Sequence, residues 1–467
     1  MKQVRNMILL LLLSAASYAQ DITGDWNGTL KVQSIQLRLV IHVSKAGEGY
    51  TATMDSPDQN ARGLPVSQIG FASPVFTFSI SSAGISYEGS LNEKQEIIGN
   101  FKQGGQVIPL VLSKNGGDQI AIQRPQTPVK PYPYYSEEVS IINSKDNVTL
   151  AGTLTLPKKE GSFPAVILIT GSGAQNRDEE VFQHKPFLVI ADYLTRNGIA
   201  VLRYDDRGVF GSTGNFSTST SEDFVRDVEA GLAFLESRKE IDKKSIGLIG
   251  HSEGGMIAPI VASKHKEITF IVLLAGPGIP GDELLIAQGA LLAKASGMAK
   301  GEIDPDLQIQ RDLVGIVKSS KDNISLVNTL TAYYKKALKE NSGLKKPEGV
   351  TEEAFIQSQI AQLTSPWMVN YIKYDPAPTL ALVHCPVLAL NGAKDLQVPP
   401  KENLAAIKAG LEKGGNKNVT VKELPGLNHL FQEAGTGSPE EYGTITQTFS
   451  PVALEAILGW LKGQVFK

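Results

Sequence analysis

The sequence predicts an α/β protein: a mostly parallel eight-stranded sheet with helices on both faces, preceded by a small antiparallel β-domain. Residues 20–125 alternate apolar and polar side chains with a period of two, between closely spaced turn signals, as antiparallel strands do. Residues 136–467 instead alternate short apolar runs with helix-period segments, which is typical of a parallel sheet buried on both faces. From about 278 to 375 helix-period segments follow one another without a strand, which predicts a helical cap inserted into the second domain.

Composition limits the class of function. The chain has 467 residues, of which 42% are hydrophobic and 20% charged, so it is long enough for two or three globular domains. Its formal net charge of −3 gives no reason to expect nucleic acid or an anionic membrane as partner. Cys385 is the only cysteine, so no disulfide forms within the chain. The six histidines show no metal-ligand spacing, and we expect no metal site.

The first 19 residues are predicted to be a signal peptide. Lys2 and Arg5 give a basic start, residues 7–13 are an apolar core, and residues 17–19 fit a small-residue cleavage site. No cysteine follows the apolar core, so lipid attachment is not expected there. No later stretch reaches the ~18 apolar residues of a membrane helix. We therefore expect a periplasmic or secreted protein without membrane insertion.

Residues 20–125 predict about eight short strands and no helix. A meander curled into a barrel suits them, because closure removes exposed strand edges. Gly24–Asp25–Trp26 resembles the Gly-x-Trp of lipocalin-like barrels; the alternative is that Trp26 only fills one end of the core. A stiff linker rich in proline and tyrosine is expected at 126–135.

The second domain is predicted element by element. Strands are expected at 137–142, 148–156, 164–170, 199–203, 245–250, 269–275, 386–391 and 419–424, the first two as an antiparallel hairpin. Helices are expected between them at 181–197, 221–238 and 253–264, and in the cap at 282–296, 306–319, 324–340 and 351–363. Most bulky cap residues are expected to pack the cap onto itself, whereas Trp367 and Met368 are candidates for a substrate pocket.

Residues 250–255, Gly-His-Ser-Glu-Gly-Gly, organise the predicted site. They lie between an apolar strand and a buried helix, the context that a G-x-S-x-G nucleophile elbow needs. Such a turn strains the backbone of Ser252 and exposes its hydroxyl, and Gly250 and Gly254 leave room for the packed strand and helix. The alternative is an ordinary glycine-rich turn. His251 and Glu253 are expected to be elbow-packing or surface groups.

Two further residues follow late strands in the order that this topology requires. Asp395 ends a glycine-containing turn after the strand at 386–391, and His429 ends the loop after the strand at 419–424. A serine hydroxyl needs a base to take its proton and an acid to orient that base. Each residue alone fits an ordinary loop. Together they predict a Ser252–Asp395–His429 triad with the cap inserted before Asp395.

The oxyanion donors are predicted to be the backbone N–H groups of Glu253 and Ser172, because the loop after the third strand supplies the second donor in this topology. Gly173 lets backbone approach substrate closely and is a candidate substrate contact. Residues 176–178 are expected to brace that loop. Residues 205–208, Asp-Asp-Arg-Gly, lack a phosphate-loop pattern and are expected to form an internally paired turn that supports the site. His184 is expected to be structural.

These motifs, from Thr170–Gly173 through Arg203–Gly208, residues 250–255 and Asn391–Asp395, resemble the α/β-hydrolase superfamily. More narrowly, the chain resembles bacterial secreted or periplasmic carboxylesterases with an N-terminal β-domain and is similar to the serine aminopeptidase-like branch. The resemblance covers residues 135–467 well and the cap and β-domain much less. It implies catalytic roles for Ser252, Asp395 and His429.

The sequence therefore predicts a serine esterase that cleaves short to medium acyl or aryl esters through an acyl-enzyme, with a small-molecule substrate and no cofactor. An aminopeptidase or dipeptidyl peptidase with the same triad is the alternative. About 100 N-terminal residues are too few for a gating propeller, which disfavours an oligopeptidase. A thioesterase, an acyltransferase or a binding protein with a vestigial hydrolase domain is less favoured.

Overall fold

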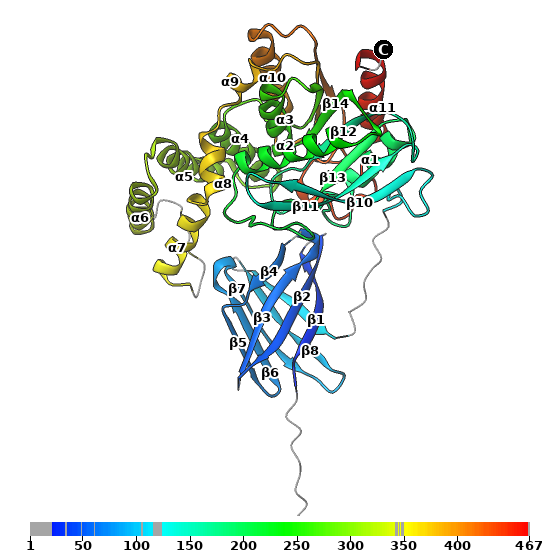
Figure 1. The fold of residues 1–467 in the computed structure, drawn as a ribbon. Helices are drawn as coiled ribbons and strands as arrows, with labels where there is room; N and C mark the ends of the chain where they lie inside the picture. The colour runs from blue at the N-terminus through cyan, green and yellow to red at the C-terminus, as the bar shows by residue number, and fades with distance from the viewer. Residues whose placement is uncertain are drawn as a thin grey trace, which may run out of the picture.

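The computed structural model describes residues 21–32, 35–47, 49–59, 61–103, 106–114, 124–340, 344, 346 and 350–465. The signal peptide predicted at 1–19 lies outside them. Figure 1 shows a β-domain (blue) below an α/β-domain, with the helices α5, α6 and α7 set to one side of the latter. The predicted fold class is confirmed.

The β-domain is an antiparallel meander whose first strand pairs with its last. Its described part holds one more strand than the sequence suggested: β1 (Gly24–Val32), β2 (Ile35–Ala46), β3 (Gly49–Ser56), β4 (Ala61–Pro65), β5 (Gln68–Ala72), β6 (Val75–Ile80), β7 (Ile85–Leu91), β8 (Glu96–Gln103) and β9 (Gln106–Ser113). The sheet order runs β4-β3-β2-β1-β9-β8-β7-β6-β5, so the sheet curls round with β4 and β5 at its two ends. Trp26 is fully buried and donates its indole N–H to the carbonyl of Ile22 over 2.7 Å.

The α/β-domain contains a mixed sheet in the order β10-β11-β13-β12-β14-β15-β16-β17. Its strands are β10 (Tyr135–Asn143), β11 (Val148–Leu156), β12 (Phe163–Ile169), β13 (Ala200–Tyr204), β14 (Ile241–His251), β15 (Ile268–Leu274), β16 (Val387–Gly392) and β17 (Val419–Leu424). The strand β11 pairs antiparallel with β10 and β13, and the others pair in parallel. Because the central strands are buried on both faces, they read as continuous apolar runs.

Helices cover both faces of this sheet. The helices α1 (Pro186–Arg196) and α11 (Pro451–Trp460) pack on one face. The other face is covered by α2 (Ser221–Ser237), α3 (Glu253–Lys264), α9 (Pro376–Leu380) and α10 (Pro400–Lys413). The two resulting apolar cores hold the strand ends that carry the candidate site in fixed positions.

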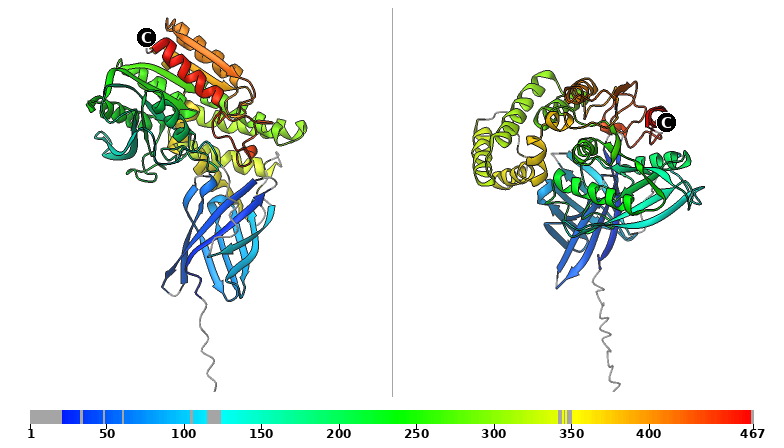
Figure 2. Two further views of the ribbon diagram at one scale, coloured as in Figure 1. Left: turned by 90° about the vertical axis from the view of Figure 1, so that its right-hand side faces the viewer. Right: turned by 45° about the horizontal axis from the view of Figure 1, so that its top comes forward.

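The segment between β15 and β16 is helical, as predicted. It forms α4 (Gly281–Ala295), α5 (Lys300–Ser319), α6 (Asn323–Lys339), α7 (Glu352–Leu363) and α8 (Pro366–Lys373). The helices α5 to α8 share an apolar core of their own, centred on Val317, Leu330 and Ile372, and Figure 2 shows α5 to α7 as an arc beside the α/β-domain. Leu284 of α4 and Tyr371 of α8 belong instead to the core of the α/β-domain. The cap is therefore anchored at both of its ends.

The β-domain contacts the loop that precedes α1. The backbone N–H of Phe182 donates to the carbonyl of Asp58 over 3.1 Å. The guanidinium of Arg124, just before the linker, donates to the carbonyls of Phe182, Gly443 and Ile445. The loop that contains Phe182 thus connects the β-domain with the α/β-domain.

Candidate active site

Ser252 lies at the turn between β14 and α3 in a strained conformation, with φ 52° and ψ −116°. Its N–H donates to the carbonyl of Leu274 over 2.8 Å, which ties the turn to the neighbouring strand β15. A Cβ at Gly250 would lie 2.0 Å from the carbonyl oxygen of Gly254, and one at Gly254 would lie 2.1 Å from that of Ile169. Both glycines are therefore required by close packing, as predicted, and the turn can hold the partly exposed Ser252 in this conformation.

Asp395 and His429 are hydrogen-bonded to each other. Nδ1 of the His429 ring lies 2.8 Å from Oδ2 of Asp395, and both side chains are buried. The other oxygen of Asp395 accepts the backbone N–H groups of Gln397 and Val398, each over 2.8 Å. With its oxygens occupied by donors, the carboxylate favours the tautomer in which Nδ1 of His429 carries a proton and Nε2 is free to accept one.

His251, the residue before Ser252, contacts His429 directly. Its Nε2 lies 3.0 Å from the backbone carbonyl oxygen of His429, and the two ring centroids are 4.8 Å apart. The structure thus brings the turn that carries Ser252 and the Asp395–His429 pair to one place. His251 is buried. Of the two positions expected for this residue, packing within the elbow is therefore correct and exposure at the surface is wrong.

The loop after β12 lies against Ser252. A Cβ at Gly171 would lie 3.2 Å from the Cβ of Ser252, and Ser172 and Gly173 are exposed beside it. Asp206 closes this loop: it accepts the hydroxyl of Thr170 over 2.8 Å and the N–H of Gln175 over 2.9 Å. Burial raises the pKa of Asp206 well above its usual range, although both donors favour its charged form. The turn at 205–208 supports the site as predicted, but its charged side chains pair with residues outside the turn rather than internally.

The same turn is held by arginines. Arg207 pairs with Asp227 over 2.7 Å and with Asp146 over 2.8 Å, and Arg177 pairs with Asp205 over 2.9 Å. As predicted, the residues near Arg177 brace the loop.

Glu253 presents its backbone N–H at the first turn of α3, where no intrahelical acceptor exists. Its side chain is buried, which the sequence did not suggest. Oε1 accepts the hydroxyl of Ser221 over 2.6 Å and the indole N–H of Trp367 over 2.8 Å. Burial raises the pKa of Glu253 above its ordinary value, against these two hydrogen bonds. Glu253 therefore joins α3 to the cap helix α8.

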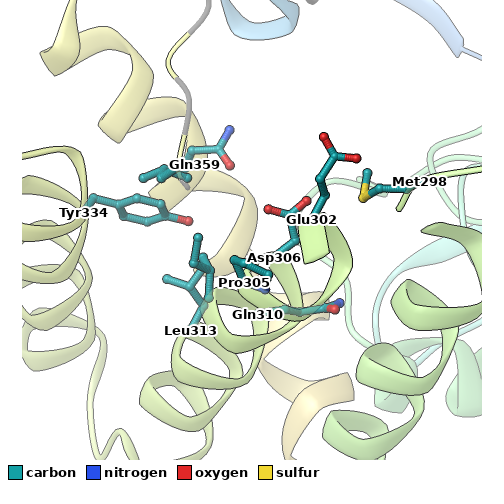
Figure 3. A pocket seen from close by; sticks show the side chains of 10 residues that line it. Met298, Glu302, Pro305, Asp306, Gln310, Leu313, Tyr334 and Gln359 are labelled. Atoms are coloured by element: carbon teal, nitrogen blue, oxygen red, sulfur yellow. The ribbon is translucent and has the colours of Figure 1, made fainter. Parts of the chain in front are cut away.

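The two candidate pocket residues of the cap differ in position. The ring of Trp367 is stacked on Tyr371 with centroids 5.1 Å apart, whereas Met368 packs against the separate core of the cap. A cavity of about 580 Å³ lies between α5, α6 and α7, and Figure 3 shows Glu302 and Asp306 on one side of it and Tyr334 on the other. Neither Ser252 nor Trp367 lines this cavity. Substrate contacts of Trp367, Met368 and Gly173 remain predictions.

No cluster of three or more potential metal ligands occurs within the described ranges. In that same part of the chain, no helix has the length and apolar character needed to cross a membrane.

Sequence reasoning did not identify Glu179. Its Oε1 lies 2.9 Å from Nδ1 of His251 and accepts the N–H of Gly171 over 2.7 Å. Glu179 lies 72 positions before His251 in the chain, and the segment around it carries no motif. The unusual backbone of Glu179, with φ 51°, marks the residue, but this feature is seen only in the structure and not in the sequence.

Several known proteins are similar to this chain. Residues 185–433 match the family described as serine aminopeptidase, S33. Esterase EstD of Thermotoga maritima is 26% identical over 294 residues, which are 63% of this chain and 61% of that relative's length. Acyl-coenzyme A thioesterase 1 of Mus musculus is 30% identical over 124 residues, 27% of this chain and 26% of the relative. The esterase Pf2001 of Pyrococcus furiosus is structurally similar with a TM-score of 0.42 and 19% identity, over 70% of this chain and 92% of that chain.

Proposed function

The chain belongs to the serine aminopeptidase S33 family, and from this premise we propose that it is a serine carboxylesterase whose nucleophile is Ser252. The observation that carries the proposal is the strained backbone of Ser252 at a strand–helix turn, beside the Asp395–His429 pair. A residue is held at positive φ only where the surrounding structure enforces it, and such strain is concentrated at functional sites.

The proposed reaction has two stages, acylation of Ser252 and hydrolysis of the acyl-enzyme. Ser252 Oγ attacks the ester carbonyl carbon while Nε2 of His429 takes its proton. The tetrahedral intermediate collapses, and the alcohol leaves with the proton from His429. Water then attacks the acyl-enzyme with His429 again as base, releasing the carboxylic acid and restoring Ser252. Asp395 orients the His429 ring and stabilises its imidazolium form.

The developing oxyanion is assigned to the N–H groups of Glu253 and Ser172. Glu253 begins α3, whose positive dipole end favours negative charge at this point. Ser172 lies in the loop whose Gly171 packs against Ser252. Donors fixed before the reaction stabilise charge without reorganisation during the step.

A small ester is the proposed substrate, in the short to medium acyl or aryl range. EstD, the relative with the longer match, is named an esterase, and the β-domain is a single curled sheet rather than a propeller that would gate peptides. A serine aminopeptidase is the second candidate, because the matched family bears that description. Both would use the same triad.

A substrate panel separates the two. It compares 4-nitrophenyl esters from acetate to decanoate with alanyl and prolyl 4-nitroanilides, using Ser252→Ala as the blank. We expect ester kcat/KM to exceed that of any anilide by about 100-fold or more. A kcat/KM near 10⁴ M⁻¹s⁻¹ or above for an anilide, which is about the lower end of the usual range for enzymes, would favour the aminopeptidase.

We also propose export to the periplasm or beyond, supported by the basic start and apolar core of the first 19 residues. Cell fractionation with N-terminal sequencing tests it: the mature chain should begin at Gln20. A chain found in the cytoplasm with its first residues intact would contradict export.

A further inference from the structure

His251 presents both ring nitrogens to hydrogen-bond acceptors. Nε2 faces the backbone carbonyl oxygen of His429 at 3.0 Å, and Nδ1 faces Oε1 of Glu179 at 2.9 Å. A carbonyl oxygen only accepts, so Nε2 must carry a proton. Oε1 of Glu179 also accepts the N–H of Gly171, and two hydrogen bonds to one oxygen favour the ionised carboxylate, which can only accept, so Nδ1 of His251 donates as well. A ring with donors on both nitrogens is an imidazolium.

The surroundings of His251 favour this charge. Burial opposes it, but the Glu179 carboxylate and the hydrogen bonds to Glu179 and His429 outweigh burial and raise the pKa of His251 above its ordinary value. Asp395 adds a further negative charge nearby. The other rings that face His251 are those of His429, at 4.8 Å, and Phe431, at 6.4 Å.

Glu179 connects this histidine to a second part of the site. The oxygen that faces His251 also accepts the N–H of Gly171, the residue before the proposed oxyanion donor Ser172. Glu179 is buried, with 4% of its surface exposed. A chain of hydrogen bonds therefore runs from Gly171 through Glu179 and His251 to the backbone of His429.

We propose that His251, held as an imidazolium by Glu179, is a positioning residue that fixes the loop of the general base relative to the oxyanion loop. The inference rests on the proposed catalytic role of His429. The proposed role of His251 involves no contact with substrate or with the reacting atoms. His251 acts because a shift of about 1 Å in a catalytic group is enough to lower the rate about 100-fold.

The test uses a double-mutant cycle on the full chain with His251→Gln, Glu179→Gln and the double variant. Glu180→Gln is the matched control, because Glu180 is the next carboxylate along the loop and its side chain pairs with Lys185 and Asn176, whereas that of Glu179 bonds to His251 and Gly171. Kinetics with 4-nitrophenyl butyrate give kcat and KM. The rate of Ser252 modification by diisopropyl fluorophosphate is measured in parallel, and it reports on the nucleophile even if esters are not the substrate.

We expect kcat and the modification rate to fall about 10- to 100-fold in His251→Gln and about 10-fold in Glu179→Gln, with KM within about threefold. The double variant should be no worse than His251→Gln alone, since both changes break one chain of bonds. Glu180→Gln should be unaffected. Losses that multiply in the double variant, or a loss in KM alone, would overturn the positioning role.

A second measurement has a wild-type readout that does not depend on the variants folding. In wild-type protein labelled with ¹⁵N-histidine, nuclear magnetic resonance at pH 7.5 should show one buried ring with protons on both nitrogens. Its signals should vanish in His251→Gln or move in Glu179→Gln. Absence of any doubly protonated ring in the wild type would contradict the imidazolium. If the protein hydrolyses no ester but still shows the doubly protonated ring and the slower modification of Ser252 in His251→Gln, only the proposed substrate is contradicted.

Discussion

The indole N–H of Trp367 donates to Oε1 of Glu253 over 2.8 Å, joining the cap helix α8 to the residue after Ser252. The two residues are 114 positions apart in the chain. Because the N–H of Trp367 is engaged by a buried carboxyl group, its first role in this structure is to hold the cap on the elbow.

Trp367→Phe tests that role. Phenylalanine can keep the stacking on Tyr371 but leaves Glu253 with one donor fewer, so we expect the free energy of unfolding to fall by ~1–3 kcal/mol. The chain-length profile across 4-nitrophenyl esters should stay unchanged. Trp460→Phe is the control, since its indole N–H donates to the exposed hydroxyl of Thr420, at 3.2 Å, and not to a buried carboxyl group. A changed profile without a stability loss would make Trp367 a substrate contact instead.

Gly250→Ala tests the packing of the elbow. The added methyl would lie 2.0 Å from the carbonyl oxygen of Gly254, so strand and helix must move apart and displace Ser252. We expect a stability loss of ~1–3 kcal/mol and a kcat lower by about 100-fold. Gly459→Ala in α11, where a Cβ meets nothing within 4 Å, should keep full activity. An active Gly250→Ala enzyme would show that the turn is not constrained as described.

Asp395→Asn tests the orientation of the base. The new amide would point N–H groups at Nδ1 of His429 and favour the wrong ring tautomer. We expect kcat to fall by on the order of 10⁴ with little change in KM. Asp242→Asn is the control, because Asp242 also accepts a backbone N–H, from Lys244, at the partly exposed start of β14. Equal activity of the two variants would remove Asp395 from the mechanism.

Because His184 is buried, we expect the free energy of unfolding to depend on pH. His184 is fully buried, and burial lowers its pKa from 6.5 to about 4. The unfolded chain therefore binds a proton below about pH 6.5 while the folded chain does not, so stability falls as pH drops toward 4. Between pH 7.5 and pH 5 this contributes a loss of ~2 kcal/mol.

Urea unfolding of wild type and His184→Gln at both pH values measures this contribution. The variant lacks the titrating group, so its loss on acidification should be smaller by that amount. Parallel pH–stability curves would show that His184 does not titrate in this way.

The sequence predicted the parts of the site that local patterns encode. Ser252 and Asp395 follow the apolar strands β14 and β16, His429 follows the alternating strand β17, and the order of the three is set by the topology. The helix α3 was predicted at its observed bounds because Glu253–Lys264 is almost wholly apolar and follows a glycine turn.

The remaining features depend on contacts across the fold. Glu179 and Trp367 act through partners far away in the chain, and no local spacing marks them. The helices α8, α9, α10 and α11 were not predicted; α8 and α9 are short, and the proline that begins each of the four is a favourable helix start that the apolar periodicity alone did not reveal. The burial of Glu253 follows from the cap lying over α3, which a charged residue after a serine does not reveal.

Chemical modification of Ser252 tests the central claim most directly. Protein treated with phenylmethylsulfonyl fluoride is examined by intact mass and peptide mapping while hydrolysis of 4-nitrophenyl butyrate is followed. We predict one adduct per chain, on Ser252, with activity lost in proportion, and no adduct in Ser252→Ala. A fully modified protein that still hydrolyses the ester, or a Ser252→Ala variant that keeps a tenth of the activity, would contradict the assignment of Ser252 as the nucleophile.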